Sequence, residues 1–327
     1  MLKSDVSGAD FYDRLKATEE ILIPHTQFKN AVARLRLSIE IARRGAEPRN
    51  AFLTGEAGTG KTWLAEYFAS LYPAEVRAHG ISKPVLLVPT PSSPTLKGLG
   101  EAILLALGDP LSHKGNAFEK RERALGLFRK SAVELVFFDE FHHFLDHARH
   151  DSLVAVTDWL KRFIDDARIP CVLMGLPRCE VVLQANEQLR RRFSSRLELP
   201  VFSIDTEQSE IEFRTILNEI DKALPTQTLS GLAEVDIARR LHFASNGLLG
   251  YLRKLITGAV ELMMVENHRT LTSNILEQAF REVIWRDGVC ELNPFNAAFK
   301  FRRLHNSGEP FAKAMATPKE ITRRDVR

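Results

Sequence analysis

The feature that most constrains this chain is a glycine-rich segment set between an apolar strand and a helix. AFLT (51–54) is a candidate buried strand, and it runs directly into GEAGTGKT (55–62), after which residues 61–71 have the pattern of a helix. Glycines in such a segment let successive backbone N–H groups and the start of the helix face an anion. The segment therefore predicts a phosphate-binding loop on a parallel α/β sheet.

Two side chains at the end of this loop complete the expected nucleotide site. Lys61 should reach the β- and γ-phosphates of ATP, and the hydroxyl of Thr62 should hold Mg²⁺. ATP and Mg²⁺ are accordingly the expected cofactors. The residues expected to contact the nucleotide here are Gly55, Glu56, Ala57, Gly58, Thr59, Gly60, Lys61, Thr62 and Trp63.

A second motif supplies carboxylates. ELVFFDE (134–140) is an apolar strand that ends in Asp139 and Glu140. Asp139 is placed to orient the ligands of Mg²⁺, while Glu140, one residue beyond the strand, is placed to polarise the attacking water. With Lys61 as a further catalytic residue, these carboxylates predict an enzyme that hydrolyses ATP to ADP and phosphate.

Short apolar runs alternate with helical segments up to about Asp205. Together with the strands above, the runs at 84–90, 170–175 and 196–201 predict an α/β fold with a five-stranded parallel sheet. Beyond Asp205 helix follows helix, which predicts a small all-helical lid domain. The expected helices there are 208–223, 232–244, 248–266 and 272–285. The expected parts are an N-terminal extension with an amphipathic helix (1–45), the α/β core (46–205), the helical lid (206–285) and a basic, irregular tail (286–327).

Several histidines follow the acidic strand. His142 and His143 come directly after it, and His147 and His150 lie nearby in the sequence. Adjacent histidines point in different directions on a helix, and no cysteine stands close enough in sequence to complete a zinc site. We therefore interpret these histidines as packed or solvated side chains rather than metal ligands.

Composition limits where the chain acts. Lys and Arg (45) nearly balance Asp and Glu (42), so binding to DNA would have to come from local basic patches. Three widely spaced cysteines fit no disulfide framework, which favours a reducing cytoplasm. The amino terminus has no secretory pattern, and apolar runs fall far short of the roughly 20 residues that cross a bilayer. We expect a cytoplasmic protein without a membrane partner.

The order of these motifs resembles that of the AAA+ P-loop ATPases. Proteins of this class complete their sites across subunit boundaries, which implies that a neighbouring subunit supplies an arginine. The segment QLRRRFSSR (188–196) stands where the class carries that residue; Arg192 is the first choice, and Arg191 and Arg196 are alternatives. Arg253 is placed as a sensor 2 residue that would contact the nucleotide. MGLPR (174–178) lacks the Ser, Thr or Asn usual at sensor 1, which departs from the pattern.

Particular segments resemble the TniB/TnsC family, AAA+ regulators of DNA transposition. The likeness spans roughly residues 15 to 300, and its segments are ILIPHT (21–26), DEFH (139–142), QLRRRF (188–193) and NPF (293–295). It implies an ATPase that assembles with itself on double-stranded DNA as a heptamer-like or hexamer-like ring or a helical filament. It also implies recruitment of a transposase, a TniQ-type target-selection partner, and disassembly on hydrolysis. Some relatives belong to CRISPR-guided transposons.

The resemblance also indicates DNA contacts after the second strand. Thr95 and Lys97 occupy the matching place, and Lys114 is a further candidate. A lysine there would neutralise phosphate without reading sequence, although each could equally be a solvated loop charge. In the tail, Phe295 and its neighbouring phenylalanines either dock on the transposase or another subunit, or pack back onto the helical domain.

Other functions remain open at this point. An IstB/DnaC-like helicase loader shares the core and differs in its partner. A nucleotide-dependent DNA-binding scaffold with little turnover would not need Glu140. An Orc-like or STAND-like switch with a winged helix is disfavoured because residues beyond 285 look too irregular, and a kinase is disfavoured because no substrate lid is evident.

Overall fold

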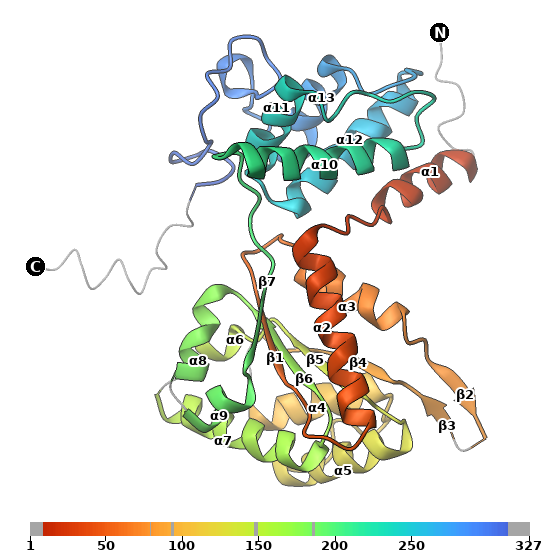
Figure 1. Ribbon diagram of the computed structural model, residues 1–327, viewed down its shortest axis with the longest axis vertical. Helices are drawn as coiled ribbons and strands as arrows, with labels where there is room; N and C mark the ends of the chain where they lie inside the picture. Colours follow the sequence, from red (N-terminus) through yellow and green to blue (C-terminus); the bar gives the residue numbers. More distant parts are fainter. Residues whose placement is uncertain (1–8, 79, 93–94, 147–149, 185–186, 313–327) are drawn as a thin grey trace, which may run out of the picture. The chain divides into compact units, whose positions relative to one another are not determined.

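The computed structural model describes residues 9–78, 80–92, 95–146, 150–184 and 187–312 (Figure 1). The chain forms two compact units, one made of residues 24–200 and the other of residues 1–23 together with 201–327. We call them the sheet unit and the helical unit. Among the described helices, none combines the length and the apolarity that crossing a bilayer requires.

The sheet unit is built on five parallel strands in the order β4-β5-β6-β1-β7 (Figure 1). Their bounds are β1 Ala51–Thr54, β4 Val85–Pro89, β5 Leu135–Asp139, β6 Cys171–Gly175 and β7 Ser195–Glu198. This confirms the predicted five-stranded parallel sheet. All five strands end at the same edge, here called the carboxyl edge, so the loops that follow β1 and β5 meet there.

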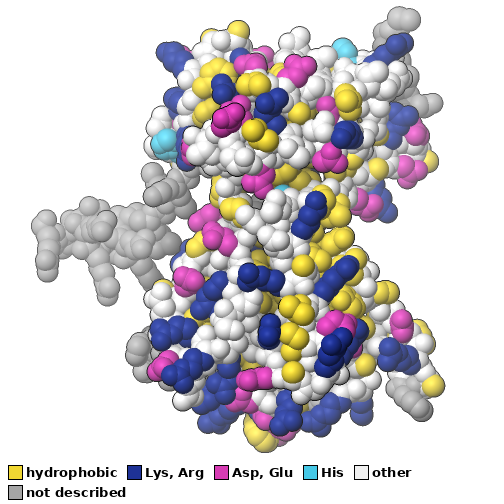
Figure 2. Space-filling model, in the orientation of Figure 1, with side chains coloured by type: hydrophobic (Ala, Val, Ile, Leu, Met, Phe, Trp, Pro, Cys, Tyr) yellow, Lys and Arg dark blue, Asp and Glu magenta, His cyan; other side chains and the backbone are white. Residues whose placement is uncertain are grey.

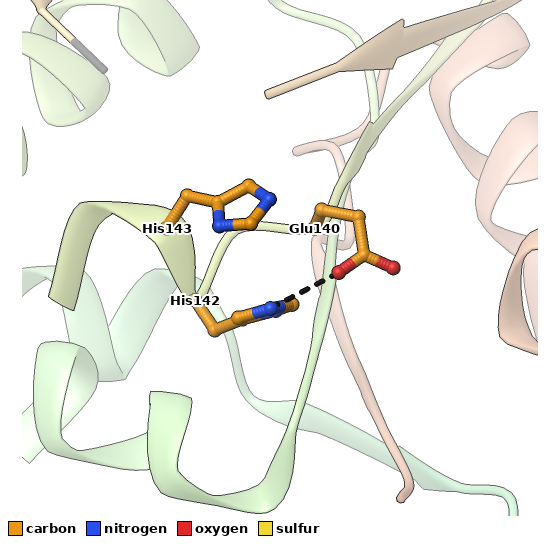
Figure 3. A group of neighbouring side chains, drawn as sticks. All are labelled: Glu140, His142 and His143. Carbon is orange, nitrogen blue, oxygen red and sulfur yellow. Dashed lines mark ion pairs between the residues drawn. The ribbon is translucent and has the colours of Figure 1, made fainter. Parts of the chain in front are cut away.

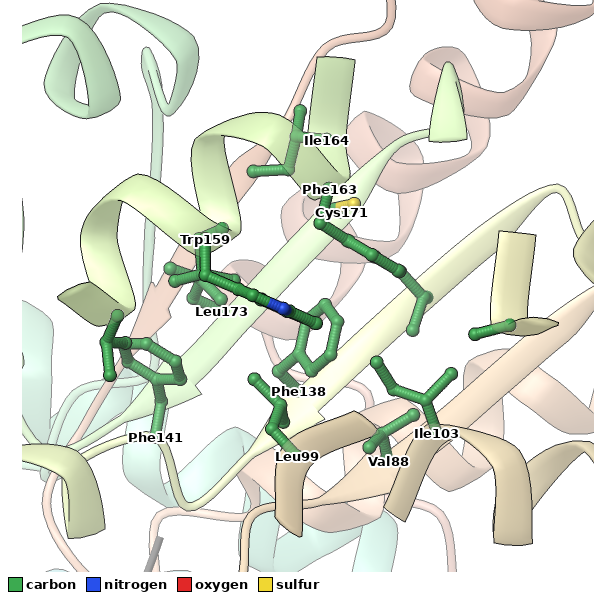
Figure 4. Packing of buried hydrophobic residues seen from close by; sticks show 14 of the residues in the cluster. Val88, Leu99, Ile103, Phe138, Phe141, Trp159, Phe163, Ile164, Cys171 and Leu173 are labelled. Carbon is green, nitrogen blue, oxygen red and sulfur yellow. The ribbon is translucent and has the colours of Figure 1, made fainter. Parts of the chain in front are cut away.

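Both faces of the sheet are covered because successive strand residues point to opposite sides. Phe137 packs edge-on against Phe68 of α3, whereas Phe138 faces Phe163 of α7 in the cluster shown in Figure 4. The helices of this unit are α2 Thr26–Arg43, α3 Lys61–Ser70, α4 Leu96–Leu107, α5 Ala117–Lys130, α6 His143–Asp146, α7 His150–Ala167, α8 Glu180–Gln184 and α9 Glu187–Arg192, with a 3-10 turn at Pro177–Cys179. Helices α4, α5 and α7 supply the apolar side chains of the Figure 4 face.

One element of the sheet unit was not predicted. Strands β2 (Glu75–Arg77) and β3 (Gly80–Ser82) form an antiparallel hairpin apart from the main sheet. Val76 on this hairpin is 89% exposed. Each strand has three residues, which is shorter than the four to eight residues over which alternation of apolar and polar side chains identifies a strand.

The helical unit packs around α12, which contacts α1, α11 and α13. Its helices are α1 Ala9–Glu19, α10 Glu207–Ala223, α11 Val235–Ser245, α12 Leu249–Val265 and α13 Ser273–Ala279, followed by a π-helical segment at Phe280–Ile284 and a 3-10 turn at Cys290–Leu292. A capping box on Thr206 begins α10. The four predicted helices are present, although α13 is shorter than expected.

The packing groups residues differently from the four-part division made on the sequence. Helix α1 belongs with the helical unit and α2 with the sheet unit, so the expected extension 1–45 is shared between them. The described part of the tail, 286–312, is irregular but not detached. Phe295 and Phe299 are 6% and 4% exposed in the core of the helical unit. Packing onto the helical domain was one of the two alternatives for these aromatic side chains.

Candidate nucleotide-binding site

The glycine-rich loop lies at the carboxyl edge, between β1 and α3. A Cβ on Gly55 would lie 2.6 Å from the carbonyl oxygen of Leu199 and 2.5 Å from Oγ1 of Thr59, so only glycine fits there. Gly58 and Gly60 have φ angles of 82° and 93°, which other residues rarely adopt. Gly60 is also the N-cap of α3 and has no side chain to bond the free N–H groups. Those groups are left for an anion.

Lys61 lies inside this loop and is only 6% exposed. Its Nζ donates to the carbonyl oxygens of Gly55 at 2.8 Å and Glu56 at 3.0 Å. Burial lowers the pKa of Lys61, while the charges of Glu140, Asp139 and Glu56 oppose that shift. The hydrogen bonds of this buried ammonium group go to neutral carbonyl oxygens, so a phosphate anion in the loop would be favoured electrostatically.

Thr62 and Asp139 meet beside this lysine. The Thr62 hydroxyl donates to Oδ2 of Asp139 at 2.6 Å, although the two residues are far apart in sequence. Asp139 is the last residue of β5, and Thr62 is in the first turn of α3, so the contact joins the carboxyl end of β5 to the start of α3. A hydroxyl and a carboxylate are hard oxygen donors of the kind Mg²⁺ prefers, so this pair fits the cation expected with ATP.

Glu140 follows β5 in a strained conformation. Its φ of 53° is in the left-handed region, uncommon for a residue with a side chain. Its backbone N–H donates to Oδ1 of Asp139 at 2.8 Å, which holds the turn. Oε2 of Glu140 lies 3.1 Å from Nε2 of His142, and the Glu140 side chain is 45% exposed. The carboxylate is therefore accessible at the same edge as the phosphate loop.

Arg192 lies at the opposite edge of the sheet. It ends α9, and its carbonyl oxygen accepts a hydrogen bond from Asn50, the residue before β1. Its guanidinium binds Asp165 through two contacts, Nε to Oδ1 at 2.8 Å and the Nη2 amine to Oδ2 at 2.9 Å. Arg192 and Asp165 line a hollow of about 490 Å³. The length of β1 separates this arginine from the phosphate loop of its own chain.

The two alternative arginines have different surroundings. Arg191 is exposed and pairs with Glu187 on the same helix. Arg196, in β7, donates to the carbonyl oxygen of Phe193 and lies near Glu180, with its guanidinium over the ring of Phe52. Arg192 alone of these three is bound by a carboxylate from a distant segment through two nitrogen atoms.

A model of the family described as "Bacterial TniB protein" matches residues 14–203, more than half of the chain. The chain belongs to the TniB family. No curated protein matches it.

The fold of this TniB-family chain is that of AAA+ ATPases. It resembles the ORC2 protein of Aeropyrum pernix, solved as ADPNP-ADP complexes, with a TM-score of 0.59, 18% identity, and coverage of 82% of this chain and 71% of that one. It also resembles Aeropyrum pernix ORC1 in complex with DNA (TM-score 0.59, 17% identity, coverage 83% and 69%). A third similar structure is Cdc6p from Pyrobaculum aerophilum (TM-score 0.59, 14% identity, coverage 82% and 70%). These likenesses, all below 25% identity, show the fold of the chain.

The candidate DNA contacts of this chain lie at the start of α4 and in the loop that follows α4. Thr95 is the N-cap of α4, and its side chain accepts from Gly98 N–H, so its hydroxyl has a structural task. Lys97 is exposed in the first turn of the same helix, and Lys114 is exposed in the loop that follows it. Nζ of Lys120 donates to Oε2 of Glu101 on α4 at 2.7 Å and to the carbonyl oxygen of Ser112 at 2.5 Å, so the loop that carries Lys114 lies beside α4.

The last two nucleotide candidates lie in different units. Trp63, half-buried on α3, packs against Phe28 and Tyr67 between α3 and α2. Arg253 lies on α12 of the helical unit and donates to the carbonyl oxygen of Ile21 at 3.1 Å. Contact of either residue with a nucleotide remains a prediction.

Sequence reasoning missed two partners at these sites. Asp165 was not linked to Arg192, because nothing in a single sequence relates the end of α7 to the end of α9. His142 was expected to point away from its neighbours, but it precedes α6 rather than lying in a helix. Donor atoms of Glu140, His142 and His143 lie within 4.8 Å of one another, so the directional reason against a shared site was wrong. His147 lies outside the described residues, and of His150 only the backbone, at the start of α7, is described.

Proposed function

We propose that this chain is a Mg²⁺-dependent ATPase that regulates DNA transposition by assembling with itself on double-stranded DNA. The observation that carries the proposal is the meeting of Lys61, the Thr62–Asp139 pair and Glu140 at the carboxyl edge. Membership of the TniB family supports the link to transposition.

Each residue has a defined task in hydrolysis. Backbone N–H groups of the loop and Lys61 would bind the phosphates, and Thr62 and Asp139 would hold Mg²⁺. Bound Mg²⁺ neutralises charge on the phosphates during the transfer. Glu140 would accept a hydrogen bond from the attacking water and orient it. Its exposed carboxylate, at the edge that carries the loop, supports this assignment.

The position of Arg192 supports assembly. An arginine at the edge opposite its own phosphate loop can complete only the site of a neighbouring subunit. The hollow beside Arg192 offers space for part of such a neighbour. A site completed by the next subunit couples hydrolysis to a ring or a filament.

DNA binding is proposed at the start of α4 and in the loop that follows α4. Lys97 and Lys114 are both exposed there, and contacts with phosphate oxygens would be independent of sequence. One solved structure of similar fold, Aeropyrum pernix ORC1, is in complex with DNA. We further propose a transposase and a TniQ-type target-selection protein as partners, and a cytoplasmic location.

Phosphate release with Glu140→Gln tests the enzymatic part. Loss of a general base costs about 10²–10⁴ in rate, so the variant should hydrolyse ATP far more slowly while still binding it. Glu134→Gln is a matched control, since Glu134 precedes the same strand at its other end and pairs with Arg43. Equal rates for wild type and Glu140→Gln would instead favour a scaffold with little turnover.

Electron microscopy of the protein with duplex DNA and Mg²⁺ tests the assembly. Regular rings or filaments should form with ATP and be lost when ADP replaces it. Co-purification with a transposase is expected; co-purification with a replicative helicase instead would reassign the chain as a helicase loader.

A further inference from the structure

Two imidazoles and the proposed catalytic carboxylate converge next to the nucleotide site. Figure 3 shows His142 directed at Glu140, with the ring of His143 beside them. Nε2 of His142 and Oε2 of Glu140 are 3.1 Å apart. One donor atom from each of the three residues lies within 4.8 Å of the others.

The local backbone produces this convergence. Glu140 turns the chain with its φ of 53°, and its carbonyl oxygen accepts from His143 N–H at 3.0 Å. Phe141 N–H donates to the carbonyl oxygen of Met174, which ties the turn to β6. His142 is 8% exposed, so its ring is confined by its surroundings. Two of the three donors are thus held by the fold, and the half-buried His143 completes the group.

We propose that Glu140, His142 and His143 form a binding site for a divalent transition-metal ion of the zinc class. Two imidazole nitrogens and one carboxylate oxygen suit Zn²⁺ and its neighbours, whereas Mg²⁺ prefers oxygen donors throughout. Ligands about 2.0–2.1 Å from a zinc ion are roughly 3.4 Å apart in a tetrahedron, so the His142–Glu140 pair already has the required separation. His143, whose donor atom lies within 4.8 Å of the other two, would complete the site by rotation of its side chain.

This ion and the Mg²⁺ of the nucleotide would use different side chains. Mg²⁺ is assigned to Thr62 and Asp139, and the proposed site uses neither. Both sites, however, depend on the same turn, and the second takes Glu140. A metal ion bound to this carboxylate occupies the lone pairs that orient the attacking water, so occupancy of the site inhibits hydrolysis. Inhibition rests on the proposed ATPase function, but metal binding does not.

Isothermal titration calorimetry with zinc chloride, in the absence of nucleotide, tests the binding. A Cys290→Ser background removes an exposed thiol that would also take zinc. His143→Ala should weaken binding at least about tenfold, since loss of even an outer partner costs a metal site about 10–100-fold in affinity. His268→Ala is the matched control, because His268 pairs with Glu266 at 3.4 Å and belongs to no such group among the described residues.

The proposal fails if wild type has no stoichiometric site, or if His143→Ala binds zinc as tightly as the His268→Ala control. His143→Gln provides a second variant should alanine disturb the start of α6. Cobalt(II) absorption supplies an independent readout, because nitrogen ligation at four-coordinate geometry gives an intense visible band that should vanish with His143.

Phosphate release with and without zinc chloride, at constant Mg²⁺ and ATP, tests the inhibition. The ratio of the two rates is compared within each variant. Wild type should lose most of its rate at saturating zinc, whereas His143→Ala should lose little. Equal inhibition of both would overturn the inhibitory role. A wild type that binds zinc but never hydrolyses ATP would refute the proposed ATPase and leave the metal site standing.

Discussion

A subunit-mixing experiment on Arg192 follows directly from the sheet topology. β1 has four residues, and the glycine-rich loop, which we propose binds phosphate, begins at its far end. At 3.3 Å per residue the strand is roughly 13 Å long, which exceeds the reach of an arginine side chain. Arg192 therefore cannot serve the nucleotide of its own chain. We predict that Arg192→Ala alone is inactive, and that its defect is repaired by a neighbour that carries Arg192.

The expected loss of hydrolysis in Arg192→Ala is much larger than the expected loss of folding stability, so the two effects can be told apart. The Arg192–Asp165 pair is partly exposed, with side chains 27% and 44% accessible, so breaking it costs the fold no more than about 1 kcal/mol. An arginine finger, by contrast, contributes about 10³–10⁵ in rate, or roughly 4–7 kcal/mol of transition-state stabilisation. The thermal midpoint should thus barely move while hydrolysis nearly disappears.

The assay mixes two inactive proteins. Arg192→Ala supplies an intact Glu140, and Glu140→Gln supplies an intact Arg192. In a random equal mixture, about a quarter of the head-to-tail interfaces combine both, so about a quarter of the wild-type rate should return. Arg191→Ala, a change to the exposed neighbour that pairs within α9, should be close to wild type by itself. A mixture no more active than its parents would refute the reasoning, as would full activity of Arg192→Ala.

Three further predictions concern the loop, a buried histidine and DNA. Gly55→Ala should abolish ATP binding, measured by fluorescent-nucleotide titration, because its Cβ would collide with a backbone oxygen 2.6 Å away; Gly126→Ala, with nothing within 4 Å, should bind normally. Burial lowers the pKa of His25 from 6.5 to about 4. The contribution of His25 to the free energy of unfolding is fully present above pH 6.5. It is lost as the pH falls toward 4, because in this range the unfolded chain takes up a proton at His25 and the folded chain does not. The free energy of unfolding should fall by about 3 kcal/mol. Urea unfolding at several pH values should show a flatter dependence for His25→Asn, and an identical dependence would contradict this assignment. Lys97→Ala combined with Lys114→Ala should reduce the slope of log binding constant against log salt by about 2 on duplex DNA, and an unchanged slope would exclude both contacts.

Local features of the amino-acid sequence were sufficient to predict the five parallel strands, the loop around Gly60 and the acidic end of β5. These features are short-range. A strand that is buried on both faces is apolar along its length, so a few consecutive residues identify it. A phosphate loop needs glycines and a lysine at fixed spacing, so a single short segment identifies it as well. The helices of the helical unit were predicted for the same reason, since their apolar residues recur at helical spacing.

Tertiary structure alone decided which distant side chains meet. The strand order places Asp139 against Thr62, and the return of α9 to the start of β1 places Arg192 at the far edge with Asp165. The left-handed turn at Glu140 brings His142 against its carboxylate. The order of apolar and polar residues along the chain determines which side chains are buried and which local secondary structure the backbone forms. Contacts between segments depend on how the elements pack, and that packing is a property of the whole fold.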